Sequence, residues 1–358
     1  MIFSRRRLLT AGAATTLAAF AACGREGEEA TSTAKTKPVS ATTAPPEPVG
    51  DENVTIYSGR NENLMAPLFE QLRPTVGFNV EVRYGSTAEM AATILEEGAN
   101  SPADLFISQD AGALGALARE GILAPLAAAT LESVDPRFRS PEGLWIGLSG
   151  RARVVVYNTD NLTETDLPSS IHGFTNEEWH GQLGWAPTNG SFQAFITAIR
   201  ATEGDAAALE WLRGIITNDP VVFPKNTPIV EAAITGDIDA GFVNHYYLLR
   251  QLADRPDVPA KNHFLKDGGP GALVNVAGAG ILASSGRSAA ALEIVDFLLG
   301  VEAQRYFAES TFEYPLIAGV EPSPGLPPLD TIGTPDIDLS DLDDLAGTLR
   351  LLQEAGVL

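Results

Sequence analysis

From residue 54 onward, short apolar runs typical of strands alternate with longer amphipathic stretches typical of helices. The first part of this series predicts strands at 54–57, 78–84 and 103–108 and helices at 64–72, 87–97 and 111–120. Alternation of this kind predicts a mainly parallel sheet with helices on both faces. Ligands of such sheets bind beyond the carboxyl ends of the strands, which here places residues 58–61, 85–86 and 109–110 at one mouth.

A long extended run at 145–158 interrupts this alternation, which then resumes. The second part predicts strands at 183–186, 221–223 and 240–243 and helices at 192–201, 206–216, 228–235 and 245–252. A Gly- and Val-rich return strand at 272–282 and helices at 289–299 and 302–309 follow. We therefore expect an α/β protein of two lobes, each a mainly parallel sheet flanked by helices, joined by two hinge-crossing strands.

The N-terminal segment, residues 1–23, has the pattern of an export signal. Three arginines at 5–7 precede an apolar stretch at 8–22 that is too short for a comfortable membrane span, and Cys23 follows directly. The arginines resemble a twin-arginine signal, and the small residues before Cys23 resemble a lipoprotein processing site. We expect export and a lipid anchor through Cys23 on the outer face of the cytoplasmic membrane.

Composition divides the rest of the chain into a linker and a folded part. Residues 24–50 are rich in Thr, Ala, Pro and Glu without an apolar period, which predicts a flexible linker. The remaining length exceeds one ordinary core, so we expect lobe 1 at 51–150 and 273–312 and lobe 2 at 151–272 and 313–358. The acidic tail after residue 325 includes an expected helix at 342–355. A formal net charge of −22 argues against nucleic-acid partners and suits a cationic ligand.

No familiar catalytic motif occurs in the sequence. It contains no Gly-x-Ser-x-Gly elbow, no His-Glu-x-x-His, no Cys-x-x-Cys and no Gly-x-x-x-x-Gly-Lys phosphate loop. We therefore expect a binding protein rather than an enzyme.

Two consecutive tyrosines, Tyr246 and Tyr247, carry the most specific chemistry. On a strand, adjacent side chains point to opposite faces, so such a pair is commonly one core ring and one surface ring. These two, however, open the predicted helix at 245–252, where successive side chains can share one space. Two phenolates suit a hard cation such as Fe3+, which offsets the cost of deprotonating phenols with a pKa of about 10.

A second group of residues has the composition of an anion site. Thr188, Asn189, Gly190 and Ser191 open a predicted helix, where free N–H groups and the helix dipole attract anions, although an ordinary helix cap has the same sequence. Other candidates follow neighbouring strands or carry guanidinium groups, which either bind the anion or hold acidic surface: Asn226, Asn244, Arg60, Arg151 and Arg153.

Taken together, these segments resemble the ferric-binding-protein family, the iron(III) substrate-binding proteins of ABC transporters with a type II periplasmic-binding-protein fold. The resemblance is carried by 54–61 (VTIYSGRN), 101–106 (SPADLF), 149–158 (SGRARVVVYN), 185–192 (WAPTNGSF), 243–248 (VNHYYL), 270–279 (PGALVNVAGA), 303–308 (AQRYFA) and 313–316 (EYPL). It implies a monomer that closes around one Fe3+ and delivers it to a membrane permease.

The resemblance also implies roles for particular residues. Tyr246 and Tyr247 match the family's tyrosine pair, and Tyr157 matches a third tyrosine of some members. The cradle at 188–191, with Asn226 and Asn244, matches positions that hold phosphate or carbonate as a synergistic anion.

The sequence departs from the family at two ligand positions. Asn61 stands where many members have His, and Gln109 stands where some have a ligating Glu. Three phenolates would still neutralise Fe3+. Asp110 and Glu62 are further candidates as substitute ligands or as groups around the metal.

A second interpretation keeps the fold and changes the cargo. Related two-lobe proteins bind a polyamine, thiamine or a small oxyanion, and aromatic rings such as Tyr246 and Tyr247 can enclose an organic cation.

Overall fold

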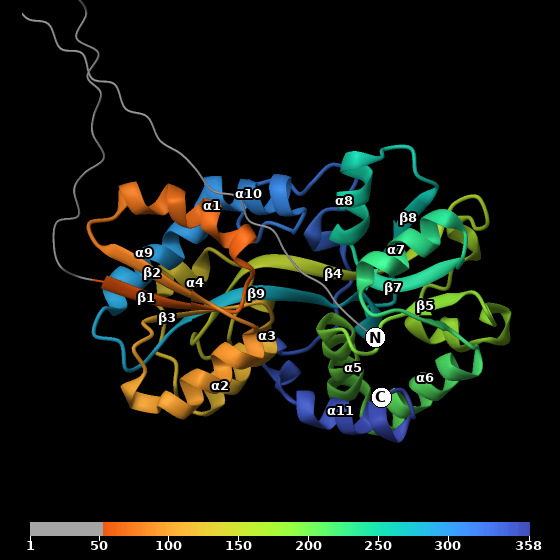
Figure 1. The fold of residues 1–358 in the computed structure, drawn as a ribbon, viewed down its shortest axis with the longest axis horizontal. Helices are drawn as coiled ribbons and strands as arrows, with labels where there is room; N and C mark the ends of the chain where they lie inside the picture. Colours follow the sequence, from red (N-terminus) through yellow and green to blue (C-terminus); the bar gives the residue numbers. More distant parts are fainter. Residues whose placement is uncertain (1–52) are drawn as a thin grey trace, which may run out of the picture. The chain divides into compact units, whose positions relative to one another are not determined.

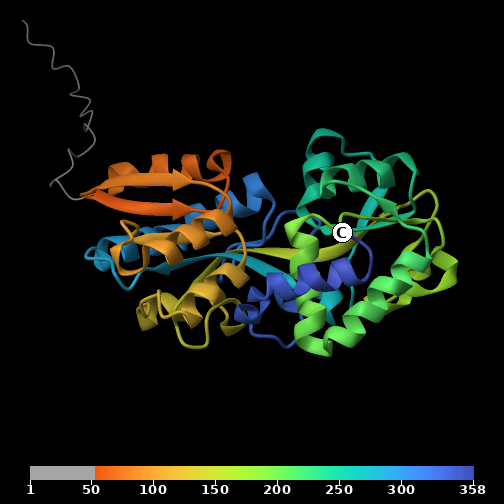
Figure 2. The ribbon, with the colours of Figure 1, turned by 60° about the horizontal axis from the view of Figure 1, so that its bottom comes forward.

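The computed structural model describes residues 53–358 (Figures 1 and 2). The predicted export signal, the linker at 24–50 and Cys23 lie outside the described residues, so their roles stay predictions. Within 53–358, no helix is long and apolar enough to span a bilayer.

Strands and helices alternate much as the hydrophobic pattern predicts. The strands are β1 (Asn53–Ser58), β2 (Asn79–Tyr84), β3 (Leu105–Ser108), β4 (Ile146–Asn158), β5 (Leu183–Trp185), β6 (Val221–Val222), β7 (Ala240–Asn244), β8 (Ala260–His263) and β9 (Val274–Ile281). The α-helices are α1 (Glu62–Leu72), α2 (Thr87–Glu97), α3 (Ala111–Arg119), α4 (Ala128–Glu132), α5 (Gly190–Glu203), α6 (Asp205–Thr217), α7 (Asn226–Thr235), α8 (Tyr246–Asp254), α9 (Ser288–Leu298), α10 (Val301–Thr311) and α11 (Leu345–Glu354).

The described strands form one sheet in the order β2-β1-β3-β9-β4-β7-β5-β6, with β8 paired to β4. The pairs of β1 with β2 and β3, and of β5 with β6 and β7, are parallel. Those made by β4 and β9 are antiparallel. The predicted α/β class is confirmed, and the sheet is mixed because the two crossing strands enter it in opposite directions.

The strand β4 connects the two halves of this sheet, and its 13 residues are all buried. Its first half, up to Ala152, pairs with β9, whereas Arg153–Asn158 pairs with β7 and β8. Figure 1 shows β4 and β9 running side by side between two groups of helices. A strand that changes partners midway presents its central residues to the space between the groups.

Buried apolar residues of the described chain form three clusters, the third of which surrounds α7 and its contacts with β4 and β7. The first contains residues of β1, β3, β9, α1 and α9. The second is rich in aromatic rings from α5, α6 and β7, with Trp211 packing edge-on against Phe195 and Phe242. The predicted lobe boundaries stay a prediction.

The C-terminal segment contributes to the first and to the second of these clusters. Tyr314, Leu339 and Leu342 are buried in the first cluster, whereas Leu351 and Leu352 of α11 are buried in the second. Figure 2 shows α11 beside α5.

Among the helices that begin shortly after a strand, four have a capping side chain. Asn61, Ser86, Asp110 and Asn189 accept hydrogen bonds from backbone N–H groups in the first turns of α1, α2, α3 and α5. Such caps fix where a helix starts. The positive ends of these four helix dipoles therefore lie at the carboxyl ends of β1, β2, β3 and β5, where ligands of α/β sheets bind.

Candidate functional site

Tyr246 and Tyr247 open α8, immediately after β7, and their rings stack with centroids 4.4 Å apart and an interplanar angle of 30°. Both line a pocket of about 430 Å³ together with Asn61, Gln109 and Glu313. The side chains share one space because His245 already has helical backbone angles, so the alternation of a strand has ended before the pair.

The surroundings of Tyr246 favour a protonated phenol. Burial, reinforced by the neighbouring Tyr247, raises the pKa of Tyr246 above its ordinary value, while the Arg151 guanidinium works in the opposite direction. The Arg250 guanidinium carbon lies 4.7 Å from the centroid of the Tyr246 ring. A cation that binds to both oxygens must therefore displace their protons.

Of the four further metal-site candidates from the sequence, two line this pocket, Asn61 and Gln109. The Asn61 side chain accepts a hydrogen bond of 2.8 Å from the Asn63 N–H, as the cap of α1. Gln109 is half-buried and lines the pocket, whereas Glu62 is exposed and does not. Asp110 caps α3 and lines a neighbouring cavity. Burial raises the pKa of Asp110, against the opposing Ala113 N–H and Arg151.

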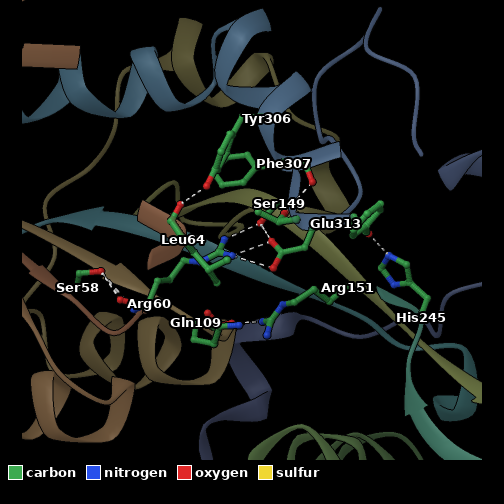
Figure 3. A network of polar contacts seen from close by, with 12 residues as sticks. Ser58, Arg60, Leu64, Gln109, Ser149, Arg151, His245, Tyr306, Phe307 and Glu313 are labelled. Atoms are coloured by element: carbon green, nitrogen blue, oxygen red, sulfur yellow. Dashed lines mark hydrogen bonds and ion pairs between the residues drawn. The ribbon is translucent and has the colours of Figure 1, made fainter. Parts of the chain in front are cut away.

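Glu313 supplies a carboxylate to the wall of the tyrosine pocket that was not predicted from sequence. It accepts two hydrogen bonds from one Arg60 nitrogen, at 2.8 and 2.9 Å, and one from the Ser149 hydroxyl (Figure 3). Burial works to raise the pKa of Glu313, but Arg60, Arg151 and the Ser149 hydrogen bond together hold it below its ordinary value. The carboxylate is charged and already engaged.

This network places Arg60, a predicted anion-binding candidate, in an ion pair inside the protein. Arg60 has no exposed surface, and its second terminal nitrogen donates to Ser149 at 2.8 Å. A guanidinium that neutralises a buried carboxylate is unavailable to a ligand.

His245, between the tyrosines and β7, is also committed to the protein. Its Nδ1 accepts a hydrogen bond of 3.1 Å from the Ala152 N–H, and its Nε2 lies 2.7 Å from the Phe312 carbonyl oxygen. These partners define the neutral tautomer with the proton on Nε2. Burial lowers the pKa of His245 to about 4. Neither ring nitrogen is free for a metal.

The predicted anion cradle lines a second cavity, of about 440 Å³. Gly190, Ser191 and Asn244 contribute to its wall, and so do Arg151 and Arg153. The two cavities have Gly59 and Gln109 in common, so the tyrosine pair and the cradle lie on either side of one boundary.

Other predicted cradle residues support its shape. Asn226 is fully buried and donates to the Ser191 hydroxyl at 3.0 Å, and Asn189 accepts from the Ser191 N–H and hydroxyl. Thr188 is exposed and lines neither cavity.

Arg153 is a buried cationic group of the cradle. Its side chain lies over the rings of Phe192 and Phe195 and donates to the Phe242 carbonyl at 3.0 Å and to Ser191 at 3.5 Å. Burial lowers the pKa of Arg153 to about 9, with a smaller opposing effect of the two tyrosines. The sequence indicates this placement, because Arg151 and Arg153 are two residues apart on one strand and residues with that spacing share a face.

Tyr157, the predicted third phenolate, lies apart from the other two. It pairs with Ala240 and Lys261 near the end of β4 and is buried in the aromatic cluster. Four residues of strand, about 13 Å, separate it from Arg153 at the cradle. Tyr157 lines neither cavity.

Across residues 53–358, no group of three or more His, Cys, Asp or Glu side chains is arranged to hold a metal ion.

The fold and this pair of adjoining cavities define a protein that binds a small solute between two groups of elements. Residues 100–338 match the family of bacterial extracellular solute-binding proteins, and the chain belongs to that family. The prediction of a binding protein rather than an enzyme is confirmed by this membership.

Two relatives cover nearly the whole described chain. The Fe(3+)-binding periplasmic protein of Serratia marcescens is 31% identical over 311 residues, which are 86% of this chain and 91% of the relative. The major ferric iron-binding protein of Neisseria meningitidis serogroup B is 32% identical over 309 residues, covering 85% and 93%.

Solved structures agree with this fold. Iron-bound HitA from Pseudomonas aeruginosa has a TM-score of 0.77 at 30% identity, covering 85% of this chain and 99% of that one. The Trichodesmium protein IdiA (FutA) in complex with iron and citrate has a TM-score of 0.76 at 28% identity, covering 86% and 100%. The predicted two-lobe periplasmic-binding fold is confirmed.

Proposed function

We propose that this protein captures Fe3+ between Tyr246 and Tyr247, with an anion in the adjoining cavity, and delivers it to an ABC permease. The stacked tyrosine pair carries the proposal, because it presents two phenol oxygens to a pocket whose nearby carboxylate and imidazole are already engaged. Relatives whose names state ferric-iron binding support it. The predicted lipid anchor at Cys23 would keep the protein beside its permease.

The anion would lie against Arg151, Arg153, Ser191 and Asn244. Phosphate and carbonate are the simplest candidates, because both accept hydrogen bonds from guanidinium and amide groups. The anion would bridge the boundary at Gly59 and Gln109 and complete the coordination of the metal.

An organic cation is a weaker candidate. Arg250 already lies over the Tyr246 ring, and Arg151 and Arg153 line the adjoining cavity. A polyamine or thiamine would meet like charge on both sides.

Phenylalanine variants test the proposed ligands. Fe3+ affinity, measured by competition with a chelator, should fall by roughly a hundredfold or more in Tyr246→Phe and in Tyr247→Phe, since losing a direct ligand costs more than losing a supporting group. Tyr157→Phe is the matched control and should bind like the wild type, because Tyr157 lines neither cavity. Unchanged affinity in Tyr246→Phe would contradict the proposal.

A further inference from the structure

Two residues of the C-terminal segment, Leu342 and Leu345, line the cavity that adjoins the tyrosine pocket. The walls of this cavity also include the start of α3, at Asp110, and the start of α5, at Gly190 and Ser191. In Figure 1, α3, α5 and α11 lie below the crossing strands, whereas α1 and α8 lie above them. Among the described residues, those that line the tyrosine pocket include none from the C-terminal segment. The segment therefore borders the cavity between α3 and α5 and leaves the tyrosine pocket uncovered.

On one side of this cavity, the short helix Leu339–Asp343 packs closely against α3. A Cβ added at Gly112 of α3 would overlap the Leu342 carbonyl oxygen, and a Cβ added at Gly115 would overlap the Ser340 carbonyl oxygen. Backbone packed at such a distance has no room to slide along α3. The short helix is therefore expected to move together with α3.

Ion pairs add to this packing. Arg119, in the last turn of α3, pairs with Asp341 at 2.7 Å and also with Asp343. Its side chain is 45% exposed, so a single pair of this kind would contribute little, but here one guanidinium bridges two carboxylates of the same short helix.

On the other side, Arg200 of α5 holds the next residue of the segment. Its guanidinium donates to the Asp344 carboxylate at 2.9 Å and to the Asp344 carbonyl oxygen at 3.0 Å. It also donates to the Thr348 hydroxyl at 3.1 Å and to Asp205 at 2.8 Å. A Cβ added at Gly347 would overlap this guanidinium. The Arg200 side chain is only 11% exposed, so solvent and salt screen these contacts less than those of Arg119.

The two attachments are adjacent in the chain. Asp343 pairs with α3 and Asp344 pairs with α5, and consecutive Cα atoms are about 3.8 Å apart. Beyond them, Leu351 and Leu352 of α11 are buried in the second apolar cluster. Hence α3 and α5 cannot move apart by more than a few ångströms while both attachments are intact.

We infer that residues 339–348 form a latch, held by Arg119 on α3 and by Arg200 on α5, that fixes the separation of these two helices and closes the cavity between them. Within residues 53–358, no hydrogen bond or ion pair joins α1 to α8 across the tyrosine pocket. A hinge motion therefore opens the cleft on that side, and a ligand enters and leaves past Tyr246 and Tyr247. The latch acts in the empty protein and does not depend on which cargo binds.

Distances between spin labels, measured by pulsed electron–electron double resonance on the metal-free protein, test the latch. Because Cys23 is the only cysteine of the sequence, Cys23→Ser confines the labels to cysteines that are introduced at exposed positions. One pair of labels joins the ends of α3 and α5, at Glu120→Cys and Ala201→Cys. The other pair joins α1 and α8, at Glu70→Cys and Ala253→Cys.

We expect a narrow distance distribution between α3 and α5 and a broader one between α1 and α8. In Arg119→Gln and in Arg200→Gln, the distribution between α3 and α5 should broaden and gain a population at longer distance. Gly347→Ala, whose added Cβ displaces the Arg200 guanidinium, should act in the same direction without a change of charge. Arg305→Gln removes an exposed charge that pairs with Glu302 on α10, and as the matched control it should keep the narrow distribution.

A distribution between α3 and α5 that stays narrow in every folded variant would overturn the latch. So would one that is as broad as that between α1 and α8 while both arginines are in place. Since Arg119 is largely exposed, Arg119→Gln keeps the test decisive even if loss of the less exposed Arg200 unfolds the protein. No iron is present in these measurements, so failure of the latch leaves the ferric site standing, and failure of iron binding leaves the latch standing.

Discussion

Arg60 and Glu313, which are 253 residues apart in the sequence, form a buried ion pair at 2.8 and 2.9 Å directly behind the tyrosine pocket. The pair joins the loop after β1 to the segment after α10, and Ser149 of β4 completes it. It therefore fastens three chain segments beside the crossing strand. It also engages the Glu313 carboxylate, which lines the tyrosine pocket.

Removing one partner of this pair should be costly. Glu313→Gln leaves the Arg60 charge buried without compensation, and we expect the free energy of unfolding to fall by about 3–5 kcal/mol in chemical denaturation. Arg255→Gln, which breaks the exposed pair with Glu231, is the control and should change it by at most about 1 kcal/mol. Equal effects of the two variants would contradict a structural role for the buried pair.

The neutral state of His245 predicts a particular loss of stability in acid. Burial lowers its pKa to about 4 in the folded protein, below the ordinary value of about 6.5 in the unfolded chain. As the pH falls from about 6.5 to about 4, the unfolded state takes up the proton first, so the folded state loses up to about 3 kcal/mol from this group.

Below that window both states are protonated and the loss from His245 is complete. Denaturation of His245→Gln at a series of pH values should show a shallower decline between pH 6.5 and 4 than the wild type. Carboxylates near the site, such as Glu313, contribute to acid unfolding in both proteins. A decline of the same steepness in the variant would show that His245 is not the titrating group.

The apolar pattern of the sequence predicted every strand and helix from β1 to α3 and from β5 to α8, with small errors at their ends. In these segments the apolar residues recur with the period of a strand or of a helix. The pattern missed β8, whose residues Ala260–His263 lack alternation and are held by pairing with β4. The Arg60–Glu313 pair was also out of reach, since no local pattern indicates a contact over 253 residues.

The place of Tyr157 could not be predicted from the sequence, for a different reason. The sequence indicates a long strand, but which of its residues faces the cleft depends on where its partners change. That change occurs between Ala152 and Arg153, so the two arginines lie at the cleft and Tyr157 lies in the core beyond it. The tyrosine pair was easier to interpret, because the start of a helix after a strand places both side chains locally.

Proton release should accompany iron binding. Burial and the adjacent ring raise the pKa of Tyr246, so its phenol is protonated at neutral pH before the metal arrives. Binding through both phenolates should release about two protons per iron from the protein, and affinity should therefore rise with pH. Titration with ferric citrate in a weakly buffered solution measures the release. A protein-free run gives the protons released by ferric citrate itself, and these are subtracted.

In Tyr247→Phe about one fewer proton should be released per iron bound. The same number of protons in the variant and the wild type would mean that Tyr247 is not deprotonated by the metal.

The C-terminal segment packs closely against α3, and a substitution at this contact should change stability far from the tyrosines. A Cβ added at Gly115 of α3 would overlap the backbone carbonyl of Ser340, in the short helix at Leu339–Asp343. Although Ala is a better helix former than Gly, we expect Gly115→Ala to lower the free energy of unfolding by about 1–3 kcal/mol, because backbone must move. Gly286→Ala, which adds its Cβ to open space, is the matched control. A stabilised Gly115→Ala protein would contradict the close packing of this segment.

Phenolate binding of Fe3+ at Tyr246 and Tyr247 can be seen by titrating the metal-stripped protein with ferric citrate while recording visible absorption. We expect a broad tyrosinate-to-iron band that saturates at about one iron per chain and is absent from the double variant Tyr246→Phe/Tyr247→Phe. A wild-type protein that binds no iron, or binds it without this band, would contradict it.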